Sequence, residues 1–161
     1  ESQLIAEYGE CQNNSEDFSP LADQLLLKGL LNSDLETLQK NVTSIEYETG
    51  SKIIQMNEKA DGIYFLRSGK VSVMVGDGIY VSGLDAGTCF GELALIAPDA
   101  TRTANIIADT KVFCSFLSIK AFNEISIVNP GFSELLLRNL GLILFERLKQ
   151  SNSKIIALSA M

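Results

Sequence analysis

Residue types that could hold an anion lie close together in the middle of the chain. Gly91 and Glu92 precede a short apolar segment, and Arg102 and Thr103 follow it after a polar loop. A glycine lets a ligand approach the backbone, and a helical turn over 92–95 would direct free N–H groups towards it. The forked guanidinium of an arginine matches phosphate oxygens. The segment therefore predicts a cradle for a phosphate-bearing ligand.

The carboxylate at Glu92 narrows the ligand class. A carboxylate beside a phosphate is repelled unless it accepts from donors of its own, and a sugar hydroxyl would be such a donor. This favours a ribose phosphate, and hence a nucleotide, over a bare phosphate. Two alternatives remain open. Arg102 could pair with Asp99 at the surface, and Glu92 could cap the helical turn or pair with Arg102 in a site that binds nothing.

Composition excludes several other function classes. The chain has 161 residues and no histidine, so catalytic triads that need one are excluded and metal binding loses its commonest ligand. Lys and Arg number 13 against 20 Asp and Glu, a net charge of −7, so a nucleic-acid partner is not expected. Cys11, Cys89 and Cys114 are widely spaced and are interpreted as reduced, packed side chains rather than zinc ligands.

The sequence also bears on location. No apolar stretch approaches the roughly 18 residues that a membrane-spanning helix needs, and no signal-peptide pattern is present. We therefore expect a cytoplasmic protein with no direct membrane contact. The chain begins at Glu1, not at Met, so it could be part of a longer polypeptide.

The elements that must position this segment are short strands followed by a long helix. Eight of the 12 glycines lie between Gly50 and Gly91. Runs rich in Val, Ile, Tyr and Phe alternate there with turn signals, which predicts hairpins of an antiparallel roll. Strands are expected over 52–56, 62–66, 70–75, 79–84, 103–108 and 111–117.

The flanks show helical periodicity. Leucines from Leu25 to Leu38 predict two short helices, the second capped by Asn32-Ser33, and a helix opened by Ser118 is predicted over 118–125. A long amphipathic helix should start near Pro130 and run to about 158. The expected fold is α+β: N-terminal helices, an antiparallel β-roll (a double-stranded β-helix or jelly roll) and a long C-terminal helix. Residues 1–20 are predicted as a helix and linker, and 21–161 as the domain, with its roll over about 45–117 and its C-terminal helices over 118–158.

Residues 90–104 resemble the phosphate-binding cassette of the cyclic-nucleotide-binding domain family, which includes the catabolite activator protein and protein kinase A regulatory subunits. The resemblance extends to 52–54, 61–66 and 68–71 and to the long helix from Phe132. It implies that Glu92 accepts from the ribose 2′-hydroxyl and that Arg102 pairs with the cyclic phosphate. The implied ligand contacts are Gly91, Glu92, the N–H groups of Leu93 and Ala94, Arg102, the Thr103 hydroxyl, the base-pocket residues Val81, Ser82 and Leu84, and the purine-contacting Ser151 and Asn152.

The implied function is a regulatory module, not an enzyme. It would bind cAMP, or cGMP, without a metal, and transmit binding through the C-terminal helix. Exposed Leu148, Ile155 and Leu158 on that helix predict a homodimer. Bacterial transcription regulators of this family continue beyond the long helix into a helix-turn-helix, and no such DNA-reading module is expected here. The resemblance is rather to domains attached to bacterial transporters or glutaminase-type enzymes. The alternatives are a cupin-type metalloenzyme, disfavoured by the lack of histidine, and a docking or dimerisation module that has lost its ligand.

Overall fold

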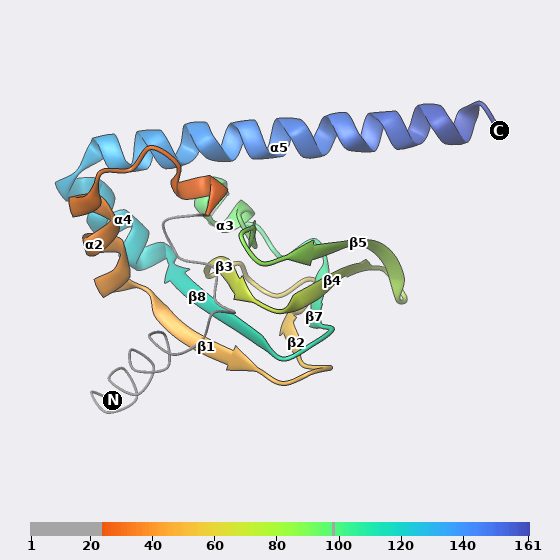
Figure 1. The fold of residues 1–161 in the computed structure, drawn as a ribbon, viewed down its shortest axis with the longest axis horizontal. Coiled ribbons are helices and arrows are strands. Elements are labelled where there is room, and N and C mark those ends of the chain that lie inside the picture. Colours follow the sequence, from red (N-terminus) through yellow and green to blue (C-terminus); the bar gives the residue numbers. More distant parts are fainter. Residues whose placement is uncertain (1–23, 98) are drawn as a thin grey trace.

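The computed structural model describes residues 24–97 and 99–161, and the predicted N-terminal helix and linker over 1–20, with Cys11, fall outside them. Within the described part, two four-stranded antiparallel sheets pack as a roll, with helices gathered at one end and α5 lying across the top (Figure 1). One sheet has the order β1-β8-β3-β6 and the other β2-β7-β4-β5. The strands are β1 (Thr43–Tyr47), β2 (Lys52–Ile54), β3 (Gly62–Ser68), β4 (Lys70–Val75), β5 (Ile79–Asp85), β6 (Cys89–Phe90), β7 (Asn105–Ala108) and β8 (Val112–Ser118).

The predicted α+β roll is confirmed, and its strands match the predicted runs closely. The β4–β5 hairpin turns through Gly76 and Gly78, whose φ angles of 57° and 86° suit glycine. The roll extends slightly beyond the predicted 45–117, because β1 begins at Thr43 and β8 ends at Ser118. Strand β1 was not predicted as a separate element, since its sequence mixes polar residues with the apolar Ile45.

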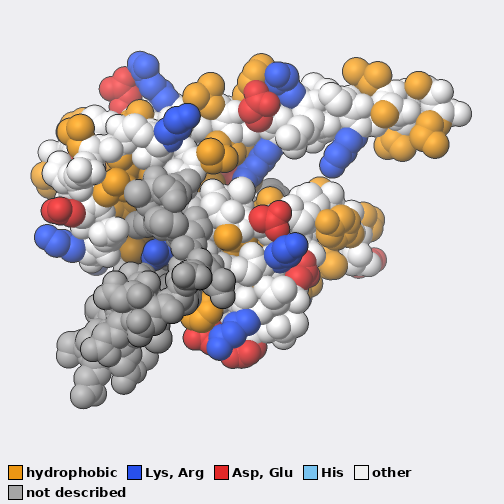
Figure 2. Space-filling model, in the orientation of Figure 1, with side chains coloured by type: hydrophobic (Ala, Val, Ile, Leu, Met, Phe, Trp, Pro, Cys, Tyr) orange, Lys and Arg blue, Asp and Glu red, His pale blue; other side chains and the backbone are white. Residues whose placement is uncertain are grey.

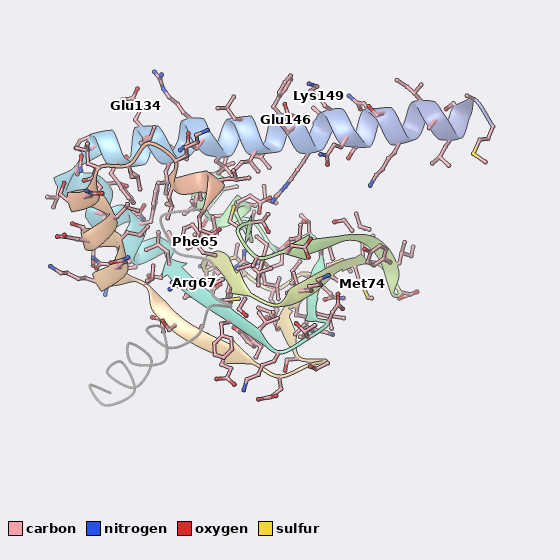
Figure 3. All side chains as sticks on the ribbon, in the orientation of Figure 1. Phe65, Arg67, Met74, Glu134, Glu146 and Lys149 are labelled. Atoms are coloured by element: carbon pink, nitrogen blue, oxygen red, sulfur yellow. The ribbon has the colours of Figure 1, made fainter. Side chains whose placement is uncertain are left out.

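Two hydrophobic clusters hold the site in place. One fills the roll and includes Phe90, the residue just before Gly91, whose ring stacks on Tyr64 at a centroid distance of 5.1 Å. The other packs the helices against the roll and includes Phe65, fully buried at its centre (Figure 3). Cys89 and Cys114 are buried and free, as the packed interpretation predicts. Strand β6, which leads into Gly91, is therefore held by both clusters, because Cys89 belongs to the second and Phe90 to the first.

The helices are η2 (Leu25–Leu27), α2 (Asn32–Asn41), α3 (Leu93–Ile96), α4 (Ile119–Val128) and α5 (Pro130–Ser159). Ser118 caps α4 as predicted, because its side chain accepts from the Ala121 N–H at 3.1 Å. The predicted Asn32-Ser33 cap is wrong: α2 begins at Asn32, its N-cap residue is Leu31, and no side chain caps it. The first pair of helices is thus a single 3₁₀ turn followed by one α-helix.

Helix α5 is rooted at one end and exposed at the other. Phe132, Leu136 and Leu140 are buried, and the Asn139 amide donates to the carbonyls of Leu26 and Lys28, which ties α5 to η2. Residues 148–161 are all exposed, and hydrophobic side chains gather at this free end (Figure 2). Despite its length, α5 is not apolar enough for a bilayer, and no other helix in the described ranges qualifies.

Candidate functional site

A cavity of about 220 Å³ opens between the roll and α5, at the segment that the sequence analysis singled out. Strands β2, β4, β5 and β7 supply its apolar wall, and the Gly91 turn, the Arg102 loop and α5 supply its polar groups. Its lining comprises Ile54, Val73, Ser82, Leu84, Phe90, Gly91, Glu92, Leu93, Arg102, Thr103, Ala104, Ile106 and Arg147. An apolar wall with a few convergent polar groups is the usual form of a small-molecule site.

Arg102 is buried, with 6% of its surface exposed. Its Nη1 donates to the Gly91 carbonyl at 2.9 Å, and its Nη2 donates to the Gly62 carbonyl at 2.8 Å and to Asp61 Oδ1 at 2.9 Å. Its ion-pair partner is therefore Asp61 and not Asp99, the partner that the surface alternative named. Since a guanidinium has five N–H donors, these three contacts leave two for a ligand.

The backbone around Arg102 is held by a neighbouring loop. Its N–H donates to the Glu58 carbonyl at 2.7 Å, and its carbonyl accepts from the Asn57 N–H at 2.8 Å. Asn57 adopts a positive φ of 72°, which an asparagine tolerates better than most residues. The arginine thus has little freedom to leave the cavity.

Gly91 must be a glycine for two separate reasons. Its φ is +74°, and a Cβ placed there would lie 2.7 Å from Arg102 Nη1 and 3.1 Å from Ile54 Cδ1. A side chain at Gly91 would consequently push the guanidinium out of position.

Glu92 faces the same cavity but has a partner that the sequence analysis did not foresee. Its Oε1 accepts from Arg147 Nη1 at 2.8 Å, and Arg147 Nη2 donates to the Cys89 carbonyl at 3.0 Å. The Glu92 side chain is 14% exposed and that of Arg147 is 34% exposed. The alternative pairing of Glu92 with Arg102 is not the one observed. Helix α5 therefore reaches the cassette through one ion pair.

The structure divides the remaining predicted residues into two groups. Ser82, Leu84, Leu93 and Thr103 line the cavity with Gly91, Glu92 and Arg102. Val81 does not: it alternates to the other face of β5 and is 48% exposed. The Ala94 N–H already donates to the Gly91 carbonyl at 3.3 Å, whereas that of Leu93 has no partner within the described residues.

Ser151 and Asn152 are exposed on α5 beyond the cavity and line no part of it, so their contact with a base stays a prediction. Arg147 and Asp61 are the residues that the sequence analysis missed. A signal for Arg147 existed, because it precedes Ser151 by about one helical turn and shares its side of α5.

Burial beside this site affects two kinds of titrating group. Removal from water, reinforced by the Glu92 carboxylate, raises the pKa of the Cys89 thiol to about 12, and Arg147 opposes that change. Burial and then the Asp61 carboxylate raise the pKa of Tyr64. Both groups are therefore neutral near pH 7. Within the described ranges, no three carboxylate or thiol groups are arranged to hold a metal ion.

Comparison with known proteins agrees with this geometry. The cyclic nucleotide-binding domain family matches residues 44–127, just over half of the chain. Glutaminase 1 of Bradyrhizobium diazoefficiens is 36% identical over 163 residues, which cover 99% of this chain. The match spans only 26% of that relative, so this chain corresponds to about a quarter of its length.

Two solved structures are also similar. The catabolite activator protein of Thermus thermophilus has a TM-score of 0.70 at 22% identity and covers 84% of this chain and 63% of its own, which shows the shared fold. The regulatory domain of Toxoplasma gondii PKA, crystallised with cAMP, has a TM-score of 0.59 at 25% identity over 65% of this chain and 41% of its own. The chain belongs to the cyclic nucleotide-binding domain family.

Proposed function

We propose that the chain is a regulatory module that binds a cyclic nucleotide monophosphate, with cAMP as the favoured ligand. One observation carries the proposal: a buried arginine with two unused donors and a partly buried carboxylate face the same small cavity. Arg102, with the Leu93 N–H, would take the phosphate. Glu92 would accept from the ribose 2′-hydroxyl, and the apolar wall formed by Ile54, Val73 and Leu84 would cover the base or sugar.

The preference for cAMP rests on similarity. The Toxoplasma regulatory domain that this chain resembles was crystallised with cAMP. Thr103 and Ser82 offer hydroxyls that could also serve the polar edge of a guanine, so cGMP is the second candidate.

Helix α5 would transmit ligand binding to the attached or partner module. A ribose hydroxyl at Glu92 would share the carboxylate whose Oε1 already accepts from Arg147, so binding would change the strength of the link between α5 and the cassette. A ligand that favours one arrangement of that link shifts its population. A coupling of about 1–3 kcal/mol is ordinary for such regulation.

The free end of α5 would pair with a second copy of the chain. Leu137, Leu148, Ile155 and Leu158 are 43%, 58%, 61% and 70% exposed. With Leu144 they occupy five of the seven positions of one spacing of four and three residues over 137–158, and Gly141 and Ser151 occupy the other two; this spacing is the pattern of a helix-to-helix seam. Symmetric pairing of two such seams gives a homodimer.

The module itself would be non-catalytic and cytoplasmic, and would regulate a larger protein. Its relative in Bradyrhizobium is named a glutaminase, of which this chain matches about a quarter. Attachment to an enzyme of that kind is the favoured setting.

Calorimetric titration with cAMP and with cGMP tests the proposal directly. We expect saturable one-site binding to at least one of them, with cAMP the tighter. At 100 times the dissociation constant, the ligand should add about 2.7 kcal/mol of stability in a parallel unfolding experiment. Absence of binding by both ligands would reject the sensor and favour the alternative, a docking module without a ligand.

A further inference from the structure

A second cavity lies among α2, α4 and the start of α5, and it has no residue in common with the cyclic-nucleotide site. Its volume of about 350 Å³ corresponds to the liquid volume of roughly twelve water molecules. We call it the α2–α4 groove. It is lined by Asp34, Thr37, Asn41, Glu124, Ile125, Val128, Asn129 and Phe132.

Most of the unused hydrogen-bonding groups on the polar side chains of this groove are acceptors. The Thr37 hydroxyl donates to the Ser33 carbonyl at 3.0 Å, and the Asn41 amide donates to the Thr37 carbonyl at 2.7 Å. The Asn129 amide donates to Asp34 Oδ1 at 2.8 Å. The Thr37 hydroxyl is thus committed to this chain, and each of the two amides keeps one free N–H, whereas the Asp34 and Glu124 carboxylates can only accept, so a ligand that faces them must bring its own donors.

The groove is also negatively charged. Asp34 and Glu124 form no ion pair within residues 24–97 and 99–161. No Lys or Arg is among the lining residues. Two carboxylates that lack an ion-pair partner and have unused acceptor sites favour a cationic donor, and a guanidinium supplies five N–H groups in one plane.

The rim of the groove is apolar, which argues against a free cation as the occupant. Val128 lines the groove and is 86% exposed, and its neighbour Ile127 is 81% exposed. These are larger exposed fractions than those of the leucines along α5. A site that combines carboxylates with exposed β-branched side chains suits a polypeptide in which a basic residue lies beside apolar ones.

We propose that the α2–α4 groove is a docking site for a polypeptide segment of a partner module that inserts an arginine, or a lysine, flanked by apolar side chains. The basic head group lies against Asp34 and Glu124, and the apolar neighbours cover Ile127 and Val128. Asn129, whose amide holds Asp34, is also the N-cap of α5, so the groove borders the joint between α4 and α5. The inference does not depend on nucleotide binding.

The test is a selection of displayed peptides on the 161-residue chain, with counter-selection on the double variant Glu124→Gln/Val128→Ser. Both of these side chains are exposed, so the fold should survive, which circular dichroism verifies. The matched control is Glu134→Gln/Leu142→Ser, which changes an exposed carboxylate and an exposed apolar residue of α5 outside the groove. Dissociation constants of the surviving peptides are then measured by fluorescence anisotropy.

We expect the survivors to carry Arg or Lys beside apolar residues. Their affinity should fall about tenfold for the groove variant, and by a similar factor when citrulline replaces the arginine, because a charge-assisted contact is lost. The control variant should bind as the unchanged chain does. The proposal is overturned if no peptide distinguishes the two variants, if survivors lack basic residues, or if free arginine alone displaces them fully, which would make the groove a site for small cations.

Discussion

Arg147 and Glu92 are separated by 55 positions in the sequence, yet Arg147 Nη1 lies 2.8 Å from Glu92 Oε1. The arginine belongs to α5 and the carboxylate to the turn that cradles the proposed phosphate. The same carboxylate is the acceptor proposed for the ribose hydroxyl. Helix α5 and the proposed ligand would therefore both contact the Glu92 carboxylate.

Replacing Arg102 should abolish most of the binding. Arg102→Ala is expected to weaken cAMP affinity by about 2–5 kcal/mol, since a buried phosphate charge would lose its partner. Arg102→Lys keeps the positive charge but loses the bidentate guanidinium. Its affinity for cAMP should lie between those of Arg102→Ala and the unchanged chain. Calorimetry measures the affinities, and thermal unfolding checks that each variant still folds. Near-unchanged affinity in a folded variant would contradict the phosphate assignment.

Glu92→Gln should matter only for ligands that have a 2′-hydroxyl. The charged acceptor is expected to contribute about 1–2 kcal/mol to binding of cAMP, and nearly nothing to binding of 2′-deoxy-cAMP. Titrating both nucleotides into both proteins measures the difference. If the deoxy analogue distinguishes the two proteins as well as cAMP does, Glu92 acts on another part of the ligand.

The Glu92–Arg147 pair should be energetically coupled without ligand and less so with it. A double-mutant cycle with Glu92→Gln and Arg147→Gln is expected to give about 0.5–1 kcal/mol in urea unfolding. Saturating cAMP should reduce this value.

The control for that cycle is Glu134–Arg138, an exposed pair on the outer side of α5 with a distance of 3.0 Å. Glu134 points away from the roll, as Glu146 and Lys149 do (Figure 3). Its coupling should be small and insensitive to cAMP. A Glu92–Arg147 coupling that cAMP leaves unchanged would count against α5 as the route of output.

Leu148→Asp should dissociate the proposed dimer, because it places a charge in the apolar seam of α5. Leu142→Asp is the matched control, an exposed leucine of the same helix outside the seam pattern. Sedimentation equilibrium should show a change from twice the chain mass to 17.5 kDa for the first variant only. A monomeric unchanged chain would disprove the seam.

Stability should fall above about pH 9 through the buried thiols. Burial raises the pKa of both Cys89 and Cys114 from the ordinary thiol value of 9.0 to about 12. The folded state then holds protons that the unfolded chain releases between pH 9 and 12, so the free energy of unfolding decreases as pH rises through that window. Each thiol should contribute a loss of about 1 kcal/mol between pH 8 and 10. Urea titrations of the chain and of Cys114→Ala measure this, and an equal loss in both proteins would refute the part assigned to Cys114.

Local sequence patterns were sufficient to predict the β-roll and the site residues that are close together in the chain. Gly91, Glu92 and Arg102 are close in the chain, so their chemistry can be interpreted together, and the strands follow from alternation and turn residues. Asp61 and Arg147 are 41 and 55 positions away in the chain from their partners Arg102 and Glu92. An arginine on the polar side of an amphipathic helix is expected to be solvated. Val81 was assigned to the base pocket together with Ser82 and Leu84 by the family resemblance, although alternation along a strand puts Val81 on the face opposite the other two.

The exposed end of α5 extends beyond the roll, so a small rotation at its base moves its tip by a larger distance. Its last polar contact with the roll is at Arg147, and every residue from 148 onwards is exposed. These residues extend roughly 20 Å at the rise of an α-helix, so a tilt of about 10° at Arg147 displaces the tip by roughly 3–4 Å. If the proposed nucleotide changes the contact at Arg147, a small adjustment beside the cavity would become a larger displacement at the tip of the helix.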